Sequence, residues 1–351
     1  MHSPASPASS AILPGADLRA LNVPDHSPDS SDRDDPNLPK ILIVTPEITY
    51  LPEGMGNLAQ RMSAKAGGLA DVSASLVRAL HIQGACVHVA LPNYARMFEL
   101  DLEERWQHAR DRVDRSVPAP HIHLAEDAAF YRRSEVYSPD ENHNIALAFQ
   151  REVINRIIPE VRPDLIHCND WMTGLIPAVA TRHGIKCLFT VHNIHTERLT
   201  LARIEDKGID AEDFWTHCYF QEQPGSYRET RDGNAVDLLT TGIFAADHVN
   251  SVSTTFLEEV IDGRHDFVPD HIGHELWQKS EAGCATGILN APDSGLDTQG
   301  DPARDHAFGP AREQGRRGET AFALADDAFG VAINIGADLH HRGQAVGRGQ
   351  R

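Results

Sequence analysis

Residues 40–47 read KILIVTPE, and this stretch decides the fold that the sequence predicts. Every residue from Ile41 to Val44 is apolar. A short run without polar positions is typical of a strand that is buried on both faces of a parallel sheet. Glu47 follows shortly after the run. The sequence therefore predicts a buried first strand with a carboxylate just beyond its carboxyl end.

Strand-like and helix-like segments alternate after this first strand. The expected strands are 40–44, 86–91, 165–167, 187–191, 248–252 and 285–289. The expected helices, where apolar residues recur at helical spacing, are 68–83, 143–158, 171–184, 235–245 and 254–262. Residues 119–137 have a weaker, strand-like character. This alternation predicts an α/β fold, a Rossmann-like parallel sheet with helices on both faces.

The two ends of the sequence differ in composition from the middle. Residues 1–39 are rich in Pro, Ser and Asp, and residues 297–351 are dominated by Gly, Ala, Arg and Asp with little apolar period. Segments of this kind bury too little apolar surface to offset the entropy of ordering. We therefore expect one folded domain over 40–296, flanked by a disordered amino-terminal segment and a disordered or aberrant tail.

The charge of the chain restricts its partners. Its formal net charge is −19, from 51 acidic and 32 basic residues. Nucleic acid and anionic membrane surfaces would repel such a chain, so neither is expected as a partner. The charge serves solubility, and an anionic substrate would need donors placed locally in its site.

The cysteines indicate a reducing compartment. There are five, an odd number, and no pair has CxxC spacing, so the sequence predicts neither a disulfide framework nor a zinc site. No basic start followed by an apolar stretch opens the sequence, and no apolar run has the length of a membrane span. The cytoplasm is the expected location.

Two adjacent glycines, Gly67 and Gly68, stand within KAGGLADV at 65–72, where the first long helix is expected to begin. Backbone N–H groups at such a helix start can bind an anion, and Lys65 would place a positive charge beside them. The same residues also suit an ordinary glycine turn in which Asp71 only stabilises the first helical turn. From spacing alone, both interpretations stay open.

Polar residues follow two later strands of the expected sheet. Asp170 follows one strand, and His192 and Asn193 follow the next. Ligands of open α/β sheets bind beyond the carboxyl ends of the strands, so a carboxylate, an imidazole and an amide would converge on one cleft and could hold sugar hydroxyls. A lone histidine is more often a buried core residue, and Trp171 suits packing at a helix start. Their shared position at strand ends favours a site.

These residues are part of a longer series of motifs. The series is KAGGLADV at 65–72, LPNY at 91–94, PDLIHCNDW at 163–171, TVHNI at 190–194, GIFAADHVNSVSTTFLEEV at 242–260 and GILNAPD at 287–293. In this order it resembles bacterial glycogen and starch synthases, a retaining glycosyltransferase family, from about residue 40 to 295. Several motifs in register are far more specific than any single glycine pattern.

The resemblance implies an activity. Members of the family fold as two Rossmann-like domains that face a cleft, the GT-B arrangement. They transfer glucose from ADP-glucose, or another nucleotide-glucose donor, to the non-reducing end of an α-1,4-glucan. They require no metal and no cofactor. This chain would correspond to the amino-terminal, acceptor-side domain.

The resemblance also implies roles for residues of this sequence. Lys65 with the amides of Gly67 and Gly68 would contact the leaving diphosphate, and His192 with Asn193 would hold the transferred glucose. His192 would also stabilise the reacting centre. The remaining candidates, which would bind hydroxyls or line the same cleft, are Asp71, Asp170, Asn290 and Glu47.

The sequence departs from the family pattern at several places. Residues 50–63 lengthen the loop before Lys65, Asn169 replaces the second histidine of the Asp-Trp motif, and Ala291 replaces a glycine. Nothing in 297–351 resembles the second domain, which holds most of the nucleotide-sugar site. We therefore expect a truncated synthase with little activity alone, or a glucan-binding half-enzyme that needs a separate carboxyl-terminal partner.

Other functions fit the sequence less well. A nicotinamide-dependent oxidoreductase would have G-x-G-x-x-G directly after the first strand, with an acidic residue about 20 positions further on. Here Val44 is followed by Thr-Pro-Glu, and the glycine pair comes only at Gly67. A structural protein without a ligand would leave the polar strand-end residues without a role.

Overall fold

The computed structural model describes residues 38–56, 58–111 and 121–290. The expected segments 1–39 and 297–351 therefore lie outside the described residues, apart from the last two positions of the first. The central feature is a sheet of seven strands that all run parallel. Its strands are β1 (Lys40–Val44), β2 (Cys86–Pro92), β3 (Ile122–Ala125), β4 (Leu165–Asn169), β5 (Lys186–Val191), β8 (His248–Ser251) and β9 (Ala285–Gly287).

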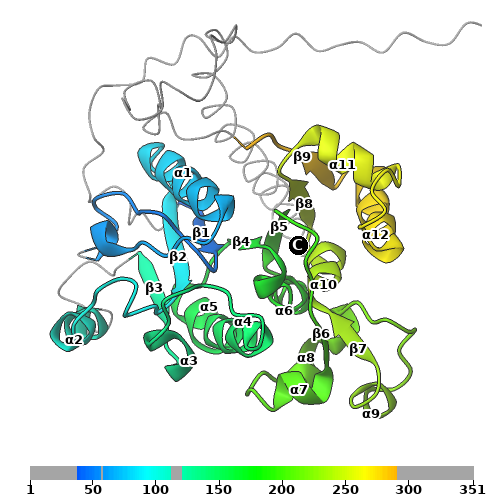
Figure 1. Ribbon diagram of the computed structural model, residues 1–351, viewed down its shortest axis with the longest axis horizontal. Helices are drawn as coiled ribbons and strands as arrows, with labels where there is room; N and C mark the ends of the chain where they lie inside the picture. The colour runs from blue at the N-terminus through cyan, green and yellow to red at the C-terminus, as the bar shows by residue number, and fades with distance from the viewer. Residues whose placement is uncertain (1–37, 57, 112–120, 291–351) are drawn as a thin grey trace, which may run out of the picture.

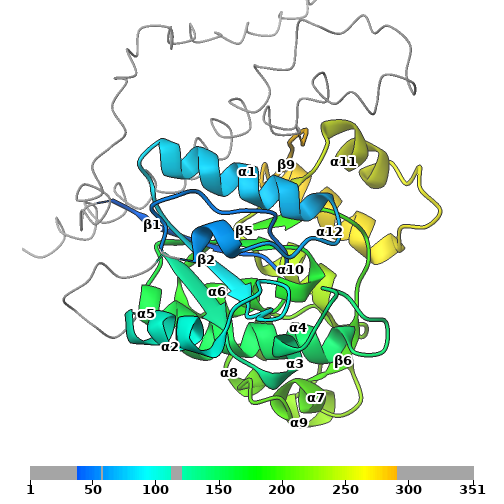
Figure 2. The ribbon, with the colours of Figure 1, turned by 60° about the vertical axis from the view of Figure 1, so that its left-hand side comes forward.

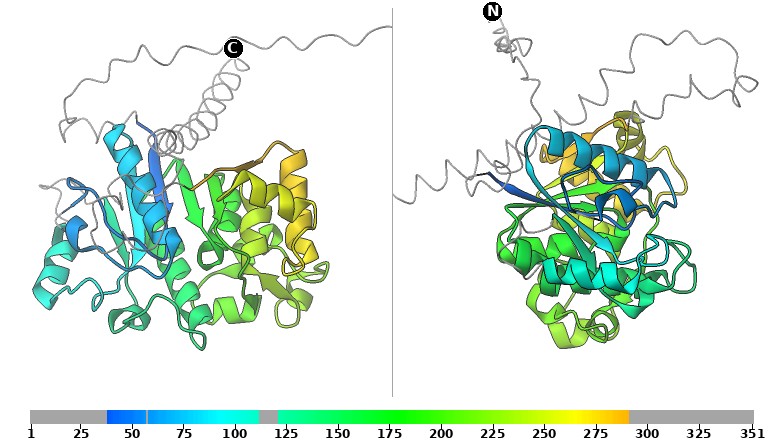
Figure 3. Two further views of the ribbon diagram at one scale, coloured as in Figure 1. Left: turned by 45° about the horizontal axis from the view of Figure 1, so that its top comes forward. Right: turned by 90° about the vertical axis from the view of Figure 1, so that its left-hand side faces the viewer.

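The strand order reverses direction in the middle of this sheet. The order is β3-β2-β1-β4-β5-β8-β9, so the chain first moves outward from β1 and then returns to add β4 on the other side of it. Figure 3 shows the same order by colour, with the blue β1 between the cyan β2 and the green β4. In open α/β sheets a ligand crevice lies at such a reversal, beyond the carboxyl ends of the strands. The topology therefore locates the candidate site before any side chain is considered.

Helices cover both faces of the sheet, as expected. Figures 1 and 2 show α1 (Gly68–Ile82) on one face and α4 (Asn142–Glu152) with α6 (Ile176–His183) on the other. The further helices of the domain are α2 (Leu102–Asp111), α3 (Ala128–Tyr131), α5 (Ile158–Val161), α7 (Leu201–Glu205), α8 (Ala211–Phe214), α9 (Tyr227–Thr230), α10 (Leu238–Ala245), α11 (Thr254–Ile261) and α12 (Asp270–Glu281). Within the described residues, no helix is both long and apolar enough to cross a membrane.

The core follows from the apolar runs that predicted the strands. Ile41 to Val44 are at most 4% exposed, and all of β2 is buried, because both strands lie inside the sheet with helices above and below. Continuous apolar runs suit this position, since neither face of an inner parallel strand meets water.

Several elements differ from the sequence-based expectation. Of the expected strand-like segment 119–137, residues 121–137 are described, and among these only Ile122–Ala125 is a strand. The expected helix at 235–245 begins with a short strand, β7 (Ala235–Asp237). β7 pairs antiparallel with β6 (Arg198–Thr200), a partner far away in the sequence, and this pairing overrides local helix propensity. The helix α12 was not predicted. Beyond Ile272 and Leu276, few of its residues are buried apolar ones, so its apolar period is weak.

The expected helix at 171–184 is divided in two. A 3₁₀ turn (Trp171–Thr173) leads into α6, and Gly184 ends α6 with a φ of 71°, a left-handed conformation that glycine adopts without strain. Between the two pieces, Gly174 touches the start of α10. A Cβ atom at Gly174 would lie 1.9 Å from the backbone oxygen of Leu238. Backbone cannot move aside easily, so this position requires glycine.

We expect Gly174→Ala to lower the free energy of unfolding by about 1–3 kcal/mol, because the added methyl group forces α10 away from the 3₁₀ turn. Urea denaturation followed by circular dichroism measures the change. Gly233→Ala is the matched control, since a Cβ atom there meets nothing within 4 Å. A Gly174→Ala variant as stable as the control would contradict the close approach of these two segments.

Candidate active site

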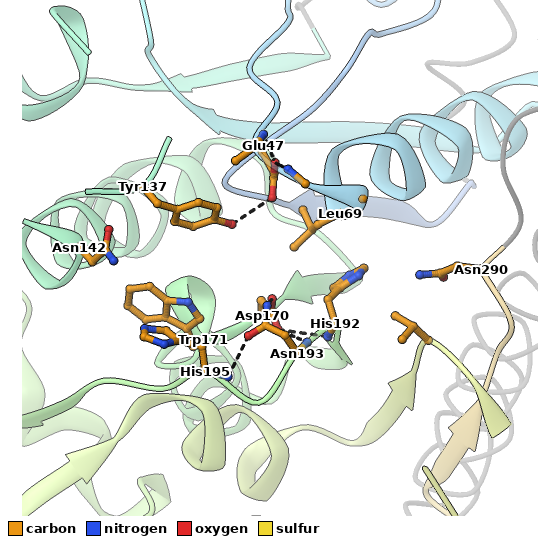
Figure 4. Close-up of a pocket in the computed structure, with 14 residues that line it drawn as sticks. Glu47, Leu69, Tyr137, Asn142, Asp170, Trp171, His192, Asn193, His195 and Asn290 are labelled. Atoms are coloured by element: carbon orange, nitrogen blue, oxygen red, sulfur yellow. Dashed lines mark hydrogen bonds between the residues drawn. The ribbon is translucent and has the colours of Figure 1, made fainter. Parts of the chain in front are cut away.

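A pocket of about 540 Å³ opens beyond the carboxyl edge of the sheet, at the reversal of strand order. Its walls come from segments that follow β1, β4, β5, β8 and β9 and from the amino-terminal end of α1 (Figure 4). All but two of the predicted site residues line it, namely Glu47, Gly67, Gly68, Asp170, His192, Asn193 and Asn290. The two exceptions, Lys65 and Asp71, lie outside the lining.

Glu47 joins the end of β1 to the start of α1. Its side chain is 2% exposed, and its Oε2 accepts hydrogen bonds from the backbone N–H groups of Ala66 at 2.6 Å and Gly67 at 2.9 Å. Its Oε1 accepts from the hydroxyl of Tyr137 at 3.0 Å. Burial and the adjacent carboxylate raise the pKa of Tyr137, so its hydroxyl keeps the proton that it donates.

The role of the glycine pair is therefore corrected in part. The N–H of Gly67, expected to be open to an anion, is donated to Glu47. Gly68 is the first residue of α1, and a Cβ atom built on it would meet nothing within 4 Å. The first N–H groups of a helix have no partner within the helix and carry the positive end of its dipole. Gly68, rather than Gly67, presents an amide at the open start of α1.

Lys65 and Asp71 form an ion pair beside the pocket. Lys65 Nζ lies 2.6 Å from Asp71 Oδ2, and the hydroxyl of Thr49 donates to Asp71 Oδ1 at 2.6 Å. Burial acts to raise the pKa of Asp71, but the hydrogen bonds from Lys65 and Thr49 outweigh it and lower the pKa below its ordinary value. In this structure, Asp71 therefore balances the charge of Lys65.

Asp170 connects the ends of β4 and β5. Its carboxylate accepts from the backbone N–H groups of His192 at 3.1 Å and Asn193 at 3.4 Å, and from Asn193 Nδ2 at 2.6 Å. Its backbone has φ 62° and ψ 176°, a region that is essentially restricted to glycine and costs on the order of 1–3 kcal/mol. Strain of this kind, maintained by surrounding contacts, is typical of functional positions.

The Asp170 carboxyl group is 1% exposed. Burial raises its pKa to about 7, aided by the nearby charge of Glu47 and opposed by the N–H groups of His192 and Asn193. Asp170 thus titrates close to neutral pH, whereas a solvated aspartate does so near pH 3.9.

The ring of His192 has a defined tautomer. Its Nε2 lies 3.0 Å from Asn169 Oδ1, while Asn169 Nδ2 donates to the carbonyl of Val44 at 3.1 Å. A carbonyl only accepts, so the NH₂ group of Asn169 faces Val44 and its Oδ1 faces His192. The Nε2 of His192 is therefore protonated. Burial lowers the pKa of His192 to about 3, so the ring is neutral and Nδ1 is its acceptor.

Asn169 orients the ring of His192, although its residue type alone marked it only as a departure from a family pattern. Its position as the last residue of β4 was the available indication, because strand ends carry the other site residues. Tyr137, Asn142 and His195 also line the pocket and were not predicted. Tyr137 and Asn142 follow no strand of the sheet directly, so the strand-end rule could not find them.

Two rings line the pocket beside the polar groups. The rings of Trp171 and His195 meet edge to face, with centroids 5.1 Å apart. Asn193 Oδ1 accepts from the backbone N–H of His195 at 2.8 Å, which fixes the loop that carries it. The arrangement offers a neutral acceptor and a buried carboxylate beside an apolar surface, which suits a polyhydroxyl ligand with apolar C–H faces.

We expect the stability difference between wild type and Asp170→Asn to depend on pH. The unfolded aspartate ionises near pH 3.9 and the folded one near pH 7, so folded Asp170 binds its proton more tightly. The native protein binds more protons than the unfolded chain between these values, so stability falls as pH rises from about 4 to about 7. The asparagine variant lacks this term, which is up to about 4 kcal/mol.

Urea denaturation of both proteins at a series of pH values checks this expectation. The free-energy difference between them should change between pH 4 and pH 7 and stay constant above pH 8. Parallel stability curves over the whole range would show that Asp170 does not titrate there.

Comparison with known proteins agrees with the geometry. The family described as the starch synthase catalytic domain matches residues 40–272. The glycogen synthase of Aliivibrio salmonicida is 28% identical over 237 residues, which cover 60% of this chain and 47% of that protein. The glycogen synthase of Thioalkalivibrio sulfidiphilus is 28% identical over 302 residues, covering 79% of this chain and 56% of the relative. The chain thus spans about half the length of the curated relatives that it matches.

A solved structure agrees at the level of the fold. The catalytic domain of starch synthase IV from Arabidopsis thaliana, bound to ADP and acarbose, aligns with a TM-score of 0.50 at 19% identity. The alignment covers 74% of this chain and 52% of that one. With the family match over residues 40–272, these findings show that the chain belongs to the starch synthase catalytic domain family.

Proposed function

We propose that this chain supplies the acceptor-side wall of a glucosyltransferase site. The reaction would move glucose from ADP-glucose, or another nucleotide-glucose, to the non-reducing end of an α-1,4-glucan with retention of configuration. One observation carries the proposal: Asp170, His192 and Asn193 converge at the reversal of the sheet in a member of the starch synthase family. The ADP and acarbose of the plant starch synthase support a nucleotide-linked donor and a sugar ligand.

The pocket would hold glucose through fixed polar groups. We assign His192 Nδ1 as an acceptor for a sugar hydroxyl, because Nε2 is committed to Asn169. Asp170 would serve mainly by orienting the segment of His192 and Asn193, and its remaining lone pairs would accept a hydroxyl. Asn290, at the edge formed by β8 and β9, would contact the ligand from the opposite side of the pocket. Groups held in place before the reaction need not reorganise as charge develops.

The leaving diphosphate needs positive charge, since the net charge of the chain is −19. We propose that Lys65 and the amide of Gly68 supply it, with the dipole of α1 adding to the attraction. Lys65 is paired with Asp71 in this structure, so Asp71 would hold Lys65 ready and share it with the diphosphate. Gly67 and Glu47 would act indirectly by fixing the loop that carries Gly68.

The described residues would supply only one wall of the site. The chain spans about half the length of its curated relatives, and the resemblance places most nucleotide-sugar contacts in the other half of such proteins. Catalysis by positioning needs both walls of the cleft. We therefore propose that the chain alone has very low activity, and that it is a glucan-binding half-enzyme if a separate partner supplies the other wall. None of its five cysteines forms a disulfide, and the cytoplasm is the proposed compartment.

Radiolabelled glucose transfer to glycogen tests the need for a second wall. We expect the purified 351-residue chain to show no turnover above background with ADP-glucose or UDP-glucose, while a full-length relative in the same assay is active. Adding a separately produced carboxyl-terminal half of a relative distinguishes an inert chain from a half-enzyme. Turnover by the chain alone, comparable to the relative, would refute the proposal.

Calorimetric titration with maltoheptaose tests the pocket itself. We expect His192→Ala to weaken binding about 10-fold, the effect of removing one hydrogen bond to a buried partner. His183→Ala is the control, because His183 is a half-exposed histidine at the end of α6, outside the pocket lining. Equal affinities of the two variants would place sugar binding elsewhere.

A further inference from the structure

Strand pairing creates a second cluster of reactive side chains away from the pocket. Cys86 and His88 lie two positions apart on β2 and so share one face of the sheet. His121 immediately precedes the neighbouring strand β3. One ligand atom from each of Cys86, His88 and His121 lies within 4.8 Å of the other two. Sequence analysis expected no metal site because no CxxC pair exists, but pairing between strands is invisible to that spacing rule.

The two imidazoles are oriented as metal ligands usually are. His121 Nδ1 lies 2.8 Å from the carbonyl of Val87, which only accepts, so Nδ1 carries the proton and a neutral ring keeps its lone pair on Nε2. His88 Nδ1 lies 3.0 Å from His123 Nε2. In metal sites the second ring nitrogen typically donates to such a partner, which fixes the tautomer and the ring orientation.

One separation between ligand atoms matches that around a tetrahedral ion. The rings of His88 and His121 are stacked face to face, with centroids 4.6 Å apart and an interplanar angle of 10°. Both rings would tilt on binding, because the lone pair of each Nε2 lies in its ring plane and the two planes must meet at the ion. Cys86 Sγ lies 3.7 Å from His88 Nε2. A tetrahedral zinc ion with Zn–S of about 2.3 Å and Zn–N of about 2.0 Å separates its sulfur and nitrogen ligands by roughly 3.6 Å.

We propose that Cys86, His88 and His121 bind one divalent transition-metal ion of the zinc class. The Cys86 thiol would lose its proton to solvent and form an S–metal bond, the two Nε2 atoms would donate their lone pairs, and water would complete four-coordination. Thiolate and imidazole together select zinc-like ions over magnesium or calcium.

The proposed ion is remote from the sugar pocket and independent of the proposed function. Cys86 is the first residue of β2, whereas the pocket lies beyond the carboxyl ends of the strands. β3 is a four-residue strand at one edge of the sheet, and among the described strands it pairs with β2 alone. A metal bound across this pair would tie the edge strand to the sheet, so its role would be structural.

Titration of the untagged, metal-free, full-length chain with cobalt(II) chloride tests the site. We expect tetrahedral d–d bands and a thiolate-to-cobalt charge-transfer band that saturate at about one equivalent and disappear when zinc chloride is added. Cys86→Ala should abolish the charge-transfer band, and His121→Gln should weaken binding at least about 10-fold. Cys284→Ala is the matched control. It also removes a thiol, but Cys284 is not part of the cluster, so this variant should bind cobalt like wild type.

X-ray absorption on the zinc-loaded wild-type chain keeps the proposal testable if a variant fails to fold. A coordination shell with one sulfur at about 2.3 Å and nitrogen or oxygen at about 2.0 Å is expected. A shell without sulfur, a stoichiometry that does not saturate, or equal cobalt spectra for Cys86→Ala and Cys284→Ala would each overturn it.

Discussion

The buried carboxylate of Asp170 holds the ends of β4 and β5 together, and the candidate site depends on it. Three N–H groups of His192 and Asn193 point at this one side chain, so the segment after β5 is shaped around a carboxyl group that is almost fully buried. The protein maintains Asp170 in a backbone conformation that glycine would adopt far more easily. The strained backbone of Asp170 lowers stability. Its side chain fixes the geometry of two strand ends that line the pocket, which accounts for a strained residue at this position.

Two further hydrogen bonds connect three strands at the same edge of the sheet. Asn169 on β4 hydrogen-bonds to Val44 on β1 with its Nδ2 and to His192 after β5 with its Oδ1. The sheet thereby fixes the position of the imidazole. Asn169 occupies a position where the family pattern has histidine. The orientation of Asn169 is fixed because its NH₂ group donates to Val44 and its Oδ1 accepts from His192. Asn169 therefore dictates that Nδ1 of His192 is the ring nitrogen left as an acceptor.

The two ends of the sheet have different chemistry for one topological reason. Parallel strands bring all their carboxyl ends to one edge and all their amino ends to the other. At the carboxyl edge the side chains form an open pocket. Near the amino ends of β2 and β3, the side chains of Cys86, His88 and His121 lie together, away from the pocket. The sheet thus keeps the candidate site and the proposed metal site at opposite ends of its strands.

The sequence by itself determined the sheet, its inner strands and most of the pocket. Apolar runs such as ILIV at 41–44 are typical of strands that are buried on both faces, and polar residues directly after such parallel strands meet at one edge of the sheet. Tertiary structure alone decided the rest. The amide of Gly67 is taken by Glu47, Lys65 is paired with Asp71, and Tyr137 and His195 reach the pocket from loops. It also decided the β6–β7 pair and the Cys86–His88–His121 cluster. Period and spacing report local conformation, whereas hydrogen-bond partners and ligand sets depend on which distant segments the folded chain brings into contact.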